Sequence, residues 1–135
     1  MHISFVVPAR IDHLSSILER IRKALYAMGW ADSAVRKVEL ASEEALVNII
    51  HHGYKEGNGQ ISVEIISLDE RVEISISDWG PPFNPLLAKQ TDLDAPLEER
   101  KEGGLGILFM RQYMDEVRYR RDADRNILTL IKKTA

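Results

Sequence analysis

The hydrophobic and polar positions of this chain follow two periods, and each period predicts one kind of secondary structure. Apolar residues that recur every three or four positions predict amphipathic helices, and this spacing occupies residues 11–28, about 32–52 and about 103–114. Short segments that are β-branched and aromatic, or that alternate every second residue, predict strands at residues 2–8, 60–68, 71–78, 116–121 and 127–132. This order predicts an α/β (α+β) two-layer sandwich, with helices on one face of a mostly antiparallel mixed sheet.

Residues 80–102 fit neither period and contain four of the five prolines. A stretch of this length without secondary structure is uncommon in a small domain and often forms a lid over a binding site. The chain length of 135 residues suits one domain. We therefore expect a single domain over residues 1–135, with the lid at about residues 81–102.

The second predicted helix carries a polar stripe on a largely apolar surface. Leu40, Val47 and Ile50 are expected to cover one side, while Glu44 and Asn48 share another sector, because a helix turns by about 100° per residue. On this helix alone, a solvated stripe and a functional site are equally good interpretations. In the functional interpretation Glu44 is a carboxylate base. The Asn48 amide oxygen then coordinates Mg²⁺, which takes oxygen ligands and keeps phosphates in its shell.

The second strand of the predicted hairpin ends its inward face with a carboxylate. Val72, Ile74, Ile76 and Asp78 share that face, because side chains alternate along a strand. A buried carboxylate needs hydrogen-bond donors. An adenine amino group is one such donor, and Gly80 would let a flat ring approach the backbone. For this cluster alone, a simple turn after the strand is the better explanation.

A glycine-rich segment, Gly103-Gly104-Leu105-Gly106, opens the last predicted helix. Backbone amides at a helix N-terminus bind phosphate oxygens, and glycines give such a loop the freedom to wrap them. The segment is not a P-loop, because no Lys-Ser/Thr pair follows, and no βαβ unit surrounds it as in a Rossmann fold. Alone it is weak evidence. Together the three clusters provide a base, a metal ligand, a ring pocket and a phosphate site for one nucleotide.

Composition narrows the expected partners and surroundings. The net charge of −3 gives no basic field for nucleic acid or an anionic membrane, and no apolar run approaches the roughly 20 residues of a membrane span. The first residues lack the pattern of a signal peptide. The chain has no cysteine, which excludes disulfides and fits a reducing cytosol. We therefore expect a cytoplasmic protein without direct contact to nucleic acid or membrane.

Three segments resemble the sequence boxes of the Bergerat-fold (GHKL) ATPases. EALVN at 44–48 resembles the N box, DWGPPF at 78–83 the G1 box, and GGLG at 103–106 the G2 box. The longer stretches EALVNIIHHGY, DWGPPFNP and GGLGILFMRQYMDEVRY resemble the bacterial anti-sigma factor serine/threonine kinases, and this resemblance covers nearly the whole chain.

The resemblance implies a fold that binds ATP or ADP with Mg²⁺, and a role in partner switching that regulates transcription. The kinase would phosphorylate a STAS-domain anti-anti-sigma protein and would inhibit a sigma factor or similar regulator by binding it. Members of the family are commonly dimers, so a homodimer is possible for this chain.

The resemblance also implies a role for each matching residue. Glu44 would take the proton from a serine or threonine hydroxyl, and Asn48 would hold Mg²⁺ that bridges the phosphates. Asp78 would accept a hydrogen from the adenine amino group, with Gly80 lining the ring. Residues 103–106 would bind phosphate through their backbone amides.

One departure from the family pattern leaves an alternative open. Many relatives have a threonine near the adenine just before or at the last strand, whereas this chain has Ile127, with Thr129 two residues later. The departure favours a non-catalytic anti-sigma or adaptor module, which would hold nucleotide only as a structural or regulatory ligand.

Overall fold

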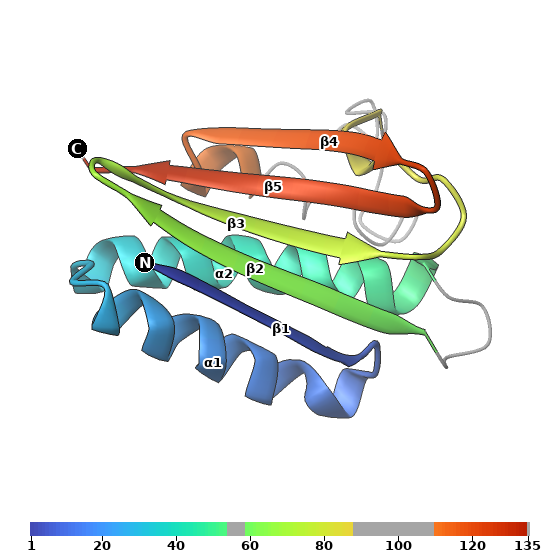
Figure 1. The fold of residues 1–135 in the computed structure, drawn as a ribbon, viewed down its shortest axis with the longest axis horizontal. Helices are drawn as coiled ribbons and strands as arrows, with labels where there is room; N and C mark the ends of the chain where they lie inside the picture. The colour runs from blue at the N-terminus through green and yellow to red at the C-terminus, as the bar shows by residue number, and fades with distance from the viewer. Residues whose placement is uncertain (54–58, 88–109, 135) are drawn as a thin grey trace, which may run out of the picture.

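The computed structural model describes residues 1–53, 59–87 and 110–134, and the structural statements that follow concern these residues. They form two layers, a five-stranded sheet and two long helices that lie against one of its faces (Figure 1). The predicted two-layer α/β sandwich is confirmed.

The sheet has the strand order β1-β2-β3-β5-β4, and each neighbouring pair is antiparallel. The strands are β1 (His2–Pro8), β2 (Gln60–Leu68), β3 (Arg71–Asp78), β4 (Glu116–Asp122) and β5 (Arg125–Lys133). The hairpin of β2 and β3 has the predicted bounds, but β5 begins two residues before its predicted start at Ile127. The earlier start brings Asn126 into the sheet, where it pairs with Asp78 of β3.

Two helices form the second layer. α1 (Leu14–Ala27) follows a 3-10 turn at Ile11–His13. α2 (Asp32–Asn48) continues directly into a π-helical turn at Ile49–Gly53. Such π turns are rare and often lie at functional sites. After β3 a short 3-10 helix spans Pro85–Leu87, and only the end of the last predicted helix, at residues 110–113, is described.

The hydrophobic core lies between the sheet and the helices. Every second residue of the inner strands faces it, as the strand period requires. The core includes Ile17, Ile21 and Leu25 of α1, Val35, Val38 and Leu46 of α2, Ile61, Val63 and Ile65 of β2, Ile74 and Ile76 of β3, and Leu130 of β5. Leu40 was predicted to face this core, but it is 40 % exposed. The buried stripe of α2 instead runs through Ala41 and Ala45.

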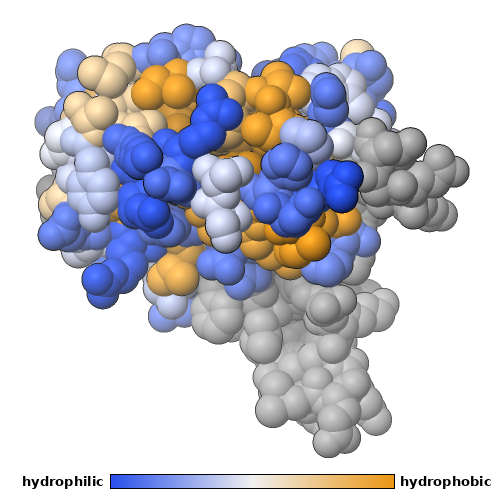
Figure 2. All heavy atoms as spheres, turned by 90° about the horizontal axis from the view of Figure 1, so that it is seen from below, coloured by the Kyte–Doolittle hydropathy of each residue, from blue (hydrophilic) through white to orange (hydrophobic). Residues whose placement is uncertain are grey.

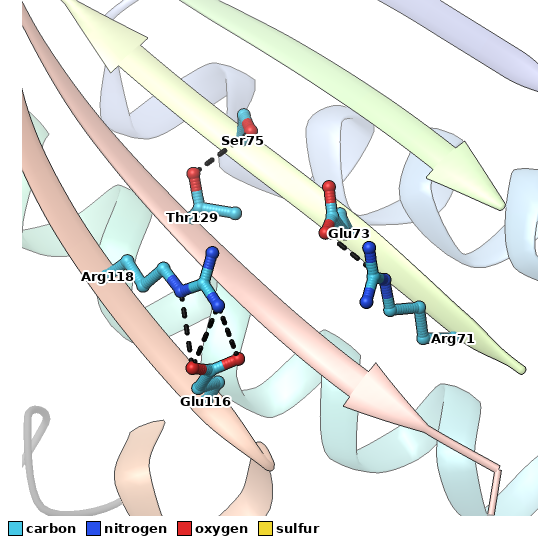
Figure 3. A network of polar contacts seen from close by, with 6 residues as sticks. All are labelled: Arg71, Glu73, Ser75, Glu116, Arg118 and Thr129. Atoms are coloured by element: carbon cyan, nitrogen blue, oxygen red, sulfur yellow. Dashed lines mark hydrogen bonds and ion pairs between the residues drawn. The ribbon is translucent and has the colours of Figure 1, made fainter. Parts of the chain in front are cut away.

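The opposite face of the sheet points away from α1 and α2 and carries many polar side chains beside buried Ile127 and Ile131. Its side chains pair along and across the strands: Arg71 with Glu73, Arg118 with Glu116, and Ser75 with Thr129 (Figure 3). Exposed ion pairs of this kind contribute little to stability. Their importance here is that they identify the outer face of β3, β4 and β5.

The side of the molecule seen from below in Figure 1 exposes hydrophilic and hydrophobic areas next to each other (Figure 2). α1 lies on this side and is amphipathic: its inner positions are buried in the core, while its serine, glutamate and lysine side chains face outward. Within the described part of the chain, no helix has both the length and the apolar character needed to span a membrane.

Candidate functional site

A small pocket lies where the end of α2 meets the ends of β3 and β5. It is lined by Ala45, Asn48 and Ile49, by Ile76 and Asp78, by Phe83 and Pro85, and by Tyr119, Asn126 and Leu128. The structure therefore brings together two of the predicted site residues, Asn48 and Asp78. The pocket volume is about 30 Å³, which is room for a water molecule.

Asp78 ends β3 at the wall of this pocket and is only 4 % exposed. Its Oδ1 accepts a hydrogen bond from the Gly80 backbone N–H at 3.0 Å and another from Asn126 Nδ2 at 3.0 Å. A buried carboxylate is costly unless donors of this kind surround it. Asp78 thus binds the backbone two residues later in a turn, the explanation that the sequence analysis preferred for this cluster alone.

Asn126 of β5 is the centre of a larger hydrogen-bond network. Besides Asp78, its Nδ2 donates to the Pro81 carbonyl at 2.9 Å. Its Oδ1 accepts from the Phe83 backbone N–H at 3.2 Å and from the Tyr119 hydroxyl at 2.5 Å. The sequence analysis missed Asn126, because its surroundings are polar and resemble a turn. The signal that could have found it is its position two residues before Leu128, on the inward face of a strand.

Ile127, the residue at which the sequence departs from the family pattern, does not line the pocket. It pairs with Ser77 in the sheet, and side chains of neighbouring residues point to opposite faces. Ile127 therefore lies on the same outer face as Thr129, which contacts Ser75 there (Figure 3). The β5 residue that reaches Asp78 is Asn126, so the identity of residue 127 does not decide the chemistry of the pocket.

Asn48, the last residue of α2, is buried and lines the pocket, and its Nδ2 has no hydrogen-bond partner among the described residues. Leaving a buried amide unpaired costs about 1–3 kcal/mol, so this side chain is well suited to meet a ligand.

The described residues contain no group of three His, Cys, Asp or Glu side chains that could hold a metal. One asparagine oxygen fits a Mg²⁺ ion that takes its other ligands from phosphates and water.

Glu44 lies on α2 one turn before Asn48 and therefore on the same side of the helix. It is half-buried and does not line the small pocket. Burial raises the pKa of the Glu44 carboxyl, and the charge of Glu43 raises it further. A carboxylate with a raised pKa holds a proton more strongly, which makes it a better general base near neutral pH.

The predicted phosphate-binding residues Gly103, Gly104, Leu105 and Gly106 lie outside the described residues. The same is true of residues 88–102 of the predicted lid. Of the predicted site residues, the structure thus describes Glu44, Asn48, Asp78 and Gly80.

Comparison with known proteins gives the family. The family model of the histidine kinase-like ATPase domain matches residues 7–132. The chain belongs to this family. The match includes Glu44, Asn48, Asp78 and Gly80, the predicted site residues that the structure describes.

Curated relatives of this ATPase domain are serine-protein kinases. The kinase RsbW of Bacillus mycoides is 28 % identical over 130 residues, which are 93 % of this chain and 81 % of that protein. RsbW of Bacillus cereus (strain Q1) is 29 % identical over the same lengths. The predicted resemblance to serine/threonine kinases of this fold is therefore confirmed.

Solved structures share the fold of this ATPase domain. The RsbU and RsbW domains of a Mycobacterium tuberculosis protein match with a TM-score of 0.72 and 19 % identity, over 98 % of this chain and 32 % of that one. The SiaB-SiaC complex of Pseudomonas aeruginosa matches with a TM-score of 0.63 and 19 % identity, over 96 % of this chain and 88 % of the matched chain. At these identities the matches establish the fold alone.

Proposed function

We propose that this protein is an ATP- and Mg²⁺-dependent serine/threonine kinase of a partner-switching system. The observation that carries the proposal is the buried Asn48 side chain, whose Nδ2 donor has no partner among the described residues, in the same pocket as the buried Asp78 carboxylate. Glu44, with its raised pKa, lies one helical turn away. A metal ligand, an acceptor for a ring amino group and a base thus come from adjoining parts of one site.

Each residue has a definite task in the proposed reaction. The Asp78 carboxylate accepts a hydrogen bond from the adenine amino group, and Asn48 holds Mg²⁺ through its side-chain oxygen. Bound Mg²⁺ reduces the negative charge on the phosphates. Glu44 accepts the proton of the attacking serine or threonine hydroxyl, whose oxygen bonds to the γ-phosphorus as the bond to the ADP oxygen breaks. Backbone amides of residues 103–106 bind the phosphates.

The proposed substrate is a STAS-domain anti-anti-sigma protein, and the proposed second partner is a sigma factor or similar regulator that the kinase inhibits. The names of the RsbW kinases and the SiaB-SiaC complex support a system in which a kinase of this fold works with a protein partner. We further propose a single cytoplasmic domain that functions as a homodimer, with residues 81–102 as a lid over the nucleotide.

A phosphorylation assay tests the proposal. The protein is incubated with Mg²⁺, labelled ATP and a STAS-domain protein from the same genome, and label on the STAS-domain protein is measured. Glu44→Gln should lower the labelling rate by about 100- to 10,000-fold, as expected for loss of a general base, while ADP still binds. Glu43→Gln is the matched control and should label normally. Equal rates for Glu44→Gln and the unchanged protein would contradict the assignment of the base.

The alternative function, a non-catalytic module, gains no support from the structure of the pocket. The sequence feature that favoured this alternative was Ile127, and the Ile127 side chain lies on the outer face of the sheet, away from Asp78. The same assay distinguishes the two functions. A STAS-domain partner that binds in the presence of saturating ATP but gains no label would favour the non-catalytic module.

A further inference from the structure

Asn126 contributes more hydrogen bonds to the pocket wall than any predicted site residue that the structure describes. We propose that Asn126 is a positioning residue: it fixes the orientation of the Asp78 carboxylate and thereby makes the site selective for purines with a 6-amino group. The proposal deepens the proposed nucleotide binding and rests on it.

The orientation of the Asn126 amide is determined by its neighbours. Nδ2 faces three groups that can only accept, Asp78 Oδ1 at 3.0 Å, the Pro81 carbonyl at 2.9 Å and the Gly80 carbonyl at 3.4 Å. Oδ1 faces the Phe83 backbone N–H, which can only donate, and the Tyr119 hydroxyl. Turning the amide by 180° would place donor against donor and acceptor against acceptor. A single orientation is therefore favoured.

The fixed amide in turn fixes Asp78. The two hydrogen bonds from Asn126 Nδ2 and Gly80 N–H both end on Oδ1, so rotation of the carboxylate would break both. Its second oxygen is held in one direction and offers an acceptor there. Such an oxygen binds the amino group of adenine and repels the carbonyl group at the same position of hypoxanthine. Discrimination is strong when a site built for one hydrogen bond meets a ligand that lacks it.

Asn126 also holds the loop after β3 against the sheet. Its bonds to the Pro81 carbonyl and the Phe83 N–H join two points of this loop to β5, and Arg121 of β4 donates to the Gly80 carbonyl at 2.8 Å. Asp78 and Phe83 both line the pocket. Removing the Asn126 amide therefore loosens two parts of the pocket wall at once, while Arg121 still holds the loop at Gly80.

Asn126→Asp is the most informative variant, because it preserves the size and shape of the side chain. The introduced carboxylate still accepts from Phe83 and Tyr119, but it faces Asp78 Oδ1 and the Pro81 carbonyl without a proton to donate. We expect the affinity for ADP to fall by about 10- to 100-fold at pH 8, the effect of losing hydrogen bonds to a charged group. The preference for ADP over IDP, which carries a carbonyl in place of the amino group, should fall towards one.

The pH dependence of this variant separates positioning from general damage. A neighbouring carboxylate raises the pKa of the introduced carboxyl, and in its protonated form that group can donate to Asp78 again. The other charged or titratable groups described around it are the Tyr119 hydroxyl and the Arg121 guanidinium. We expect ADP affinity and ADP preference to recover as the pH is lowered from 8 in Asn126→Asp only, as the introduced carboxyl takes up its proton.

Calorimetry with ADP and IDP in Mg²⁺ buffer tests the proposal. The variants are Asn126→Asp, Asn126→Ala and, as matched control, Ile127→Val, which alters the next residue of β5 on the opposite face of the sheet. Circular dichroism checks their folding. A lower ADP preference in both Asn126 variants, with Ile127→Val unchanged, supports the proposal. Unchanged preference in the folded Asn126→Asp variant overturns it. If the unchanged protein binds neither ADP nor IDP, the proposed nucleotide binding itself fails and the inference fails with it.

Discussion

Asp78→Asn is the substitution that examines the proposed adenine contact most directly. The Asp78 Oδ1 accepts from Gly80 N–H and Asn126 Nδ2, and the oxygen of the introduced amide can accept both bonds. The introduced NH₂ group then takes the place of the second carboxylate oxygen. It is a donor at the point where the adenine amino group needs an acceptor. The shape of the side chain is kept, and only the hydrogen-bonding character of one atom changes.

The expected size of the effect follows from the lost contact. A hydrogen bond to a charged group contributes about 1.5–3 kcal/mol, and at room temperature this corresponds to a rise of about 10- to 150-fold in the dissociation constant for ADP. Stability should change much less, because the two donors to Oδ1 keep an acceptor and no unpaired charge is left in the buried pocket. The variant should thus unfold near the temperature of the unchanged protein.

Isothermal titration calorimetry with ADP and Mg²⁺ measures the first effect, and thermal unfolding without nucleotide measures the second. A folded Asp78→Asn variant that binds ADP within about twofold of the unchanged protein would refute the reasoning. A twofold change in the dissociation constant is smaller than the contribution of a hydrogen bond to a charged group. In that case the adenine lies elsewhere. The Asp78 carboxylate would then serve only to bind the turn at Gly80 and the Asn126 side chain.

Three other single substitutions are expected to change stability. Glu44→Gln should stabilise the fold at neutral pH. The pKa of Glu44 is raised in the folded protein, so the unchanged protein loses stability as the pH rises from the pKa of Glu44 in the unfolded chain to its pKa in the folded chain. Glutamine does not titrate and avoids this loss. Urea unfolding should show a gain at pH 7 that disappears below the unfolded pKa. Ser42→Ala should raise the free energy of unfolding by about 1 kcal/mol, because the fully buried hydroxyl has no partner among the described residues; an unchanged urea midpoint would contradict this. Asp115→Asn should destabilise the protein at pH 7, because the Lys133 backbone N–H lowers the pKa of Asp115. That contribution is lost as pH falls through the lowered pKa, so the two proteins should become equally stable in acid.

The elements that the sequence predicted well are those defined by local periodicity. The β2–β3 hairpin alternates cleanly on both sides of a two-residue turn, and its bounds were predicted correctly. The start of β5 was missed because residues 122–126 are polar and resemble a longer loop. In the structure the turn is only two residues, and Ala123 adopts a positive φ of 54°. This conformation is unusual for a residue with a Cβ, so no residue in this segment indicated so tight a turn.

The same distinction separates the predicted from the missed site residues. Glu44 and Asn48 lie on one helix, and Asp78 and Gly80 lie in one strand and its turn, so local spacing was enough to find them. Asn126 meets Asp78 only because β5 pairs with β3, although 48 residues separate the two in the chain.

Long-range register of this kind is not encoded in any local pattern, and an error of one residue turns a side chain to the other face of the sheet. The sequence analysis compared Ile127 with a threonine that lies near the adenine in relatives, whereas the pairing of Ile127 with Ser77 places it on the outer face. Sequence boxes can therefore propose the residues that touch a nucleotide, whereas the residues that orient them have to be found from strand pairing. In this chain the pairing of β3 with β5 places Asn126 against the Asp78 carboxylate, on which the proposed adenine contact depends.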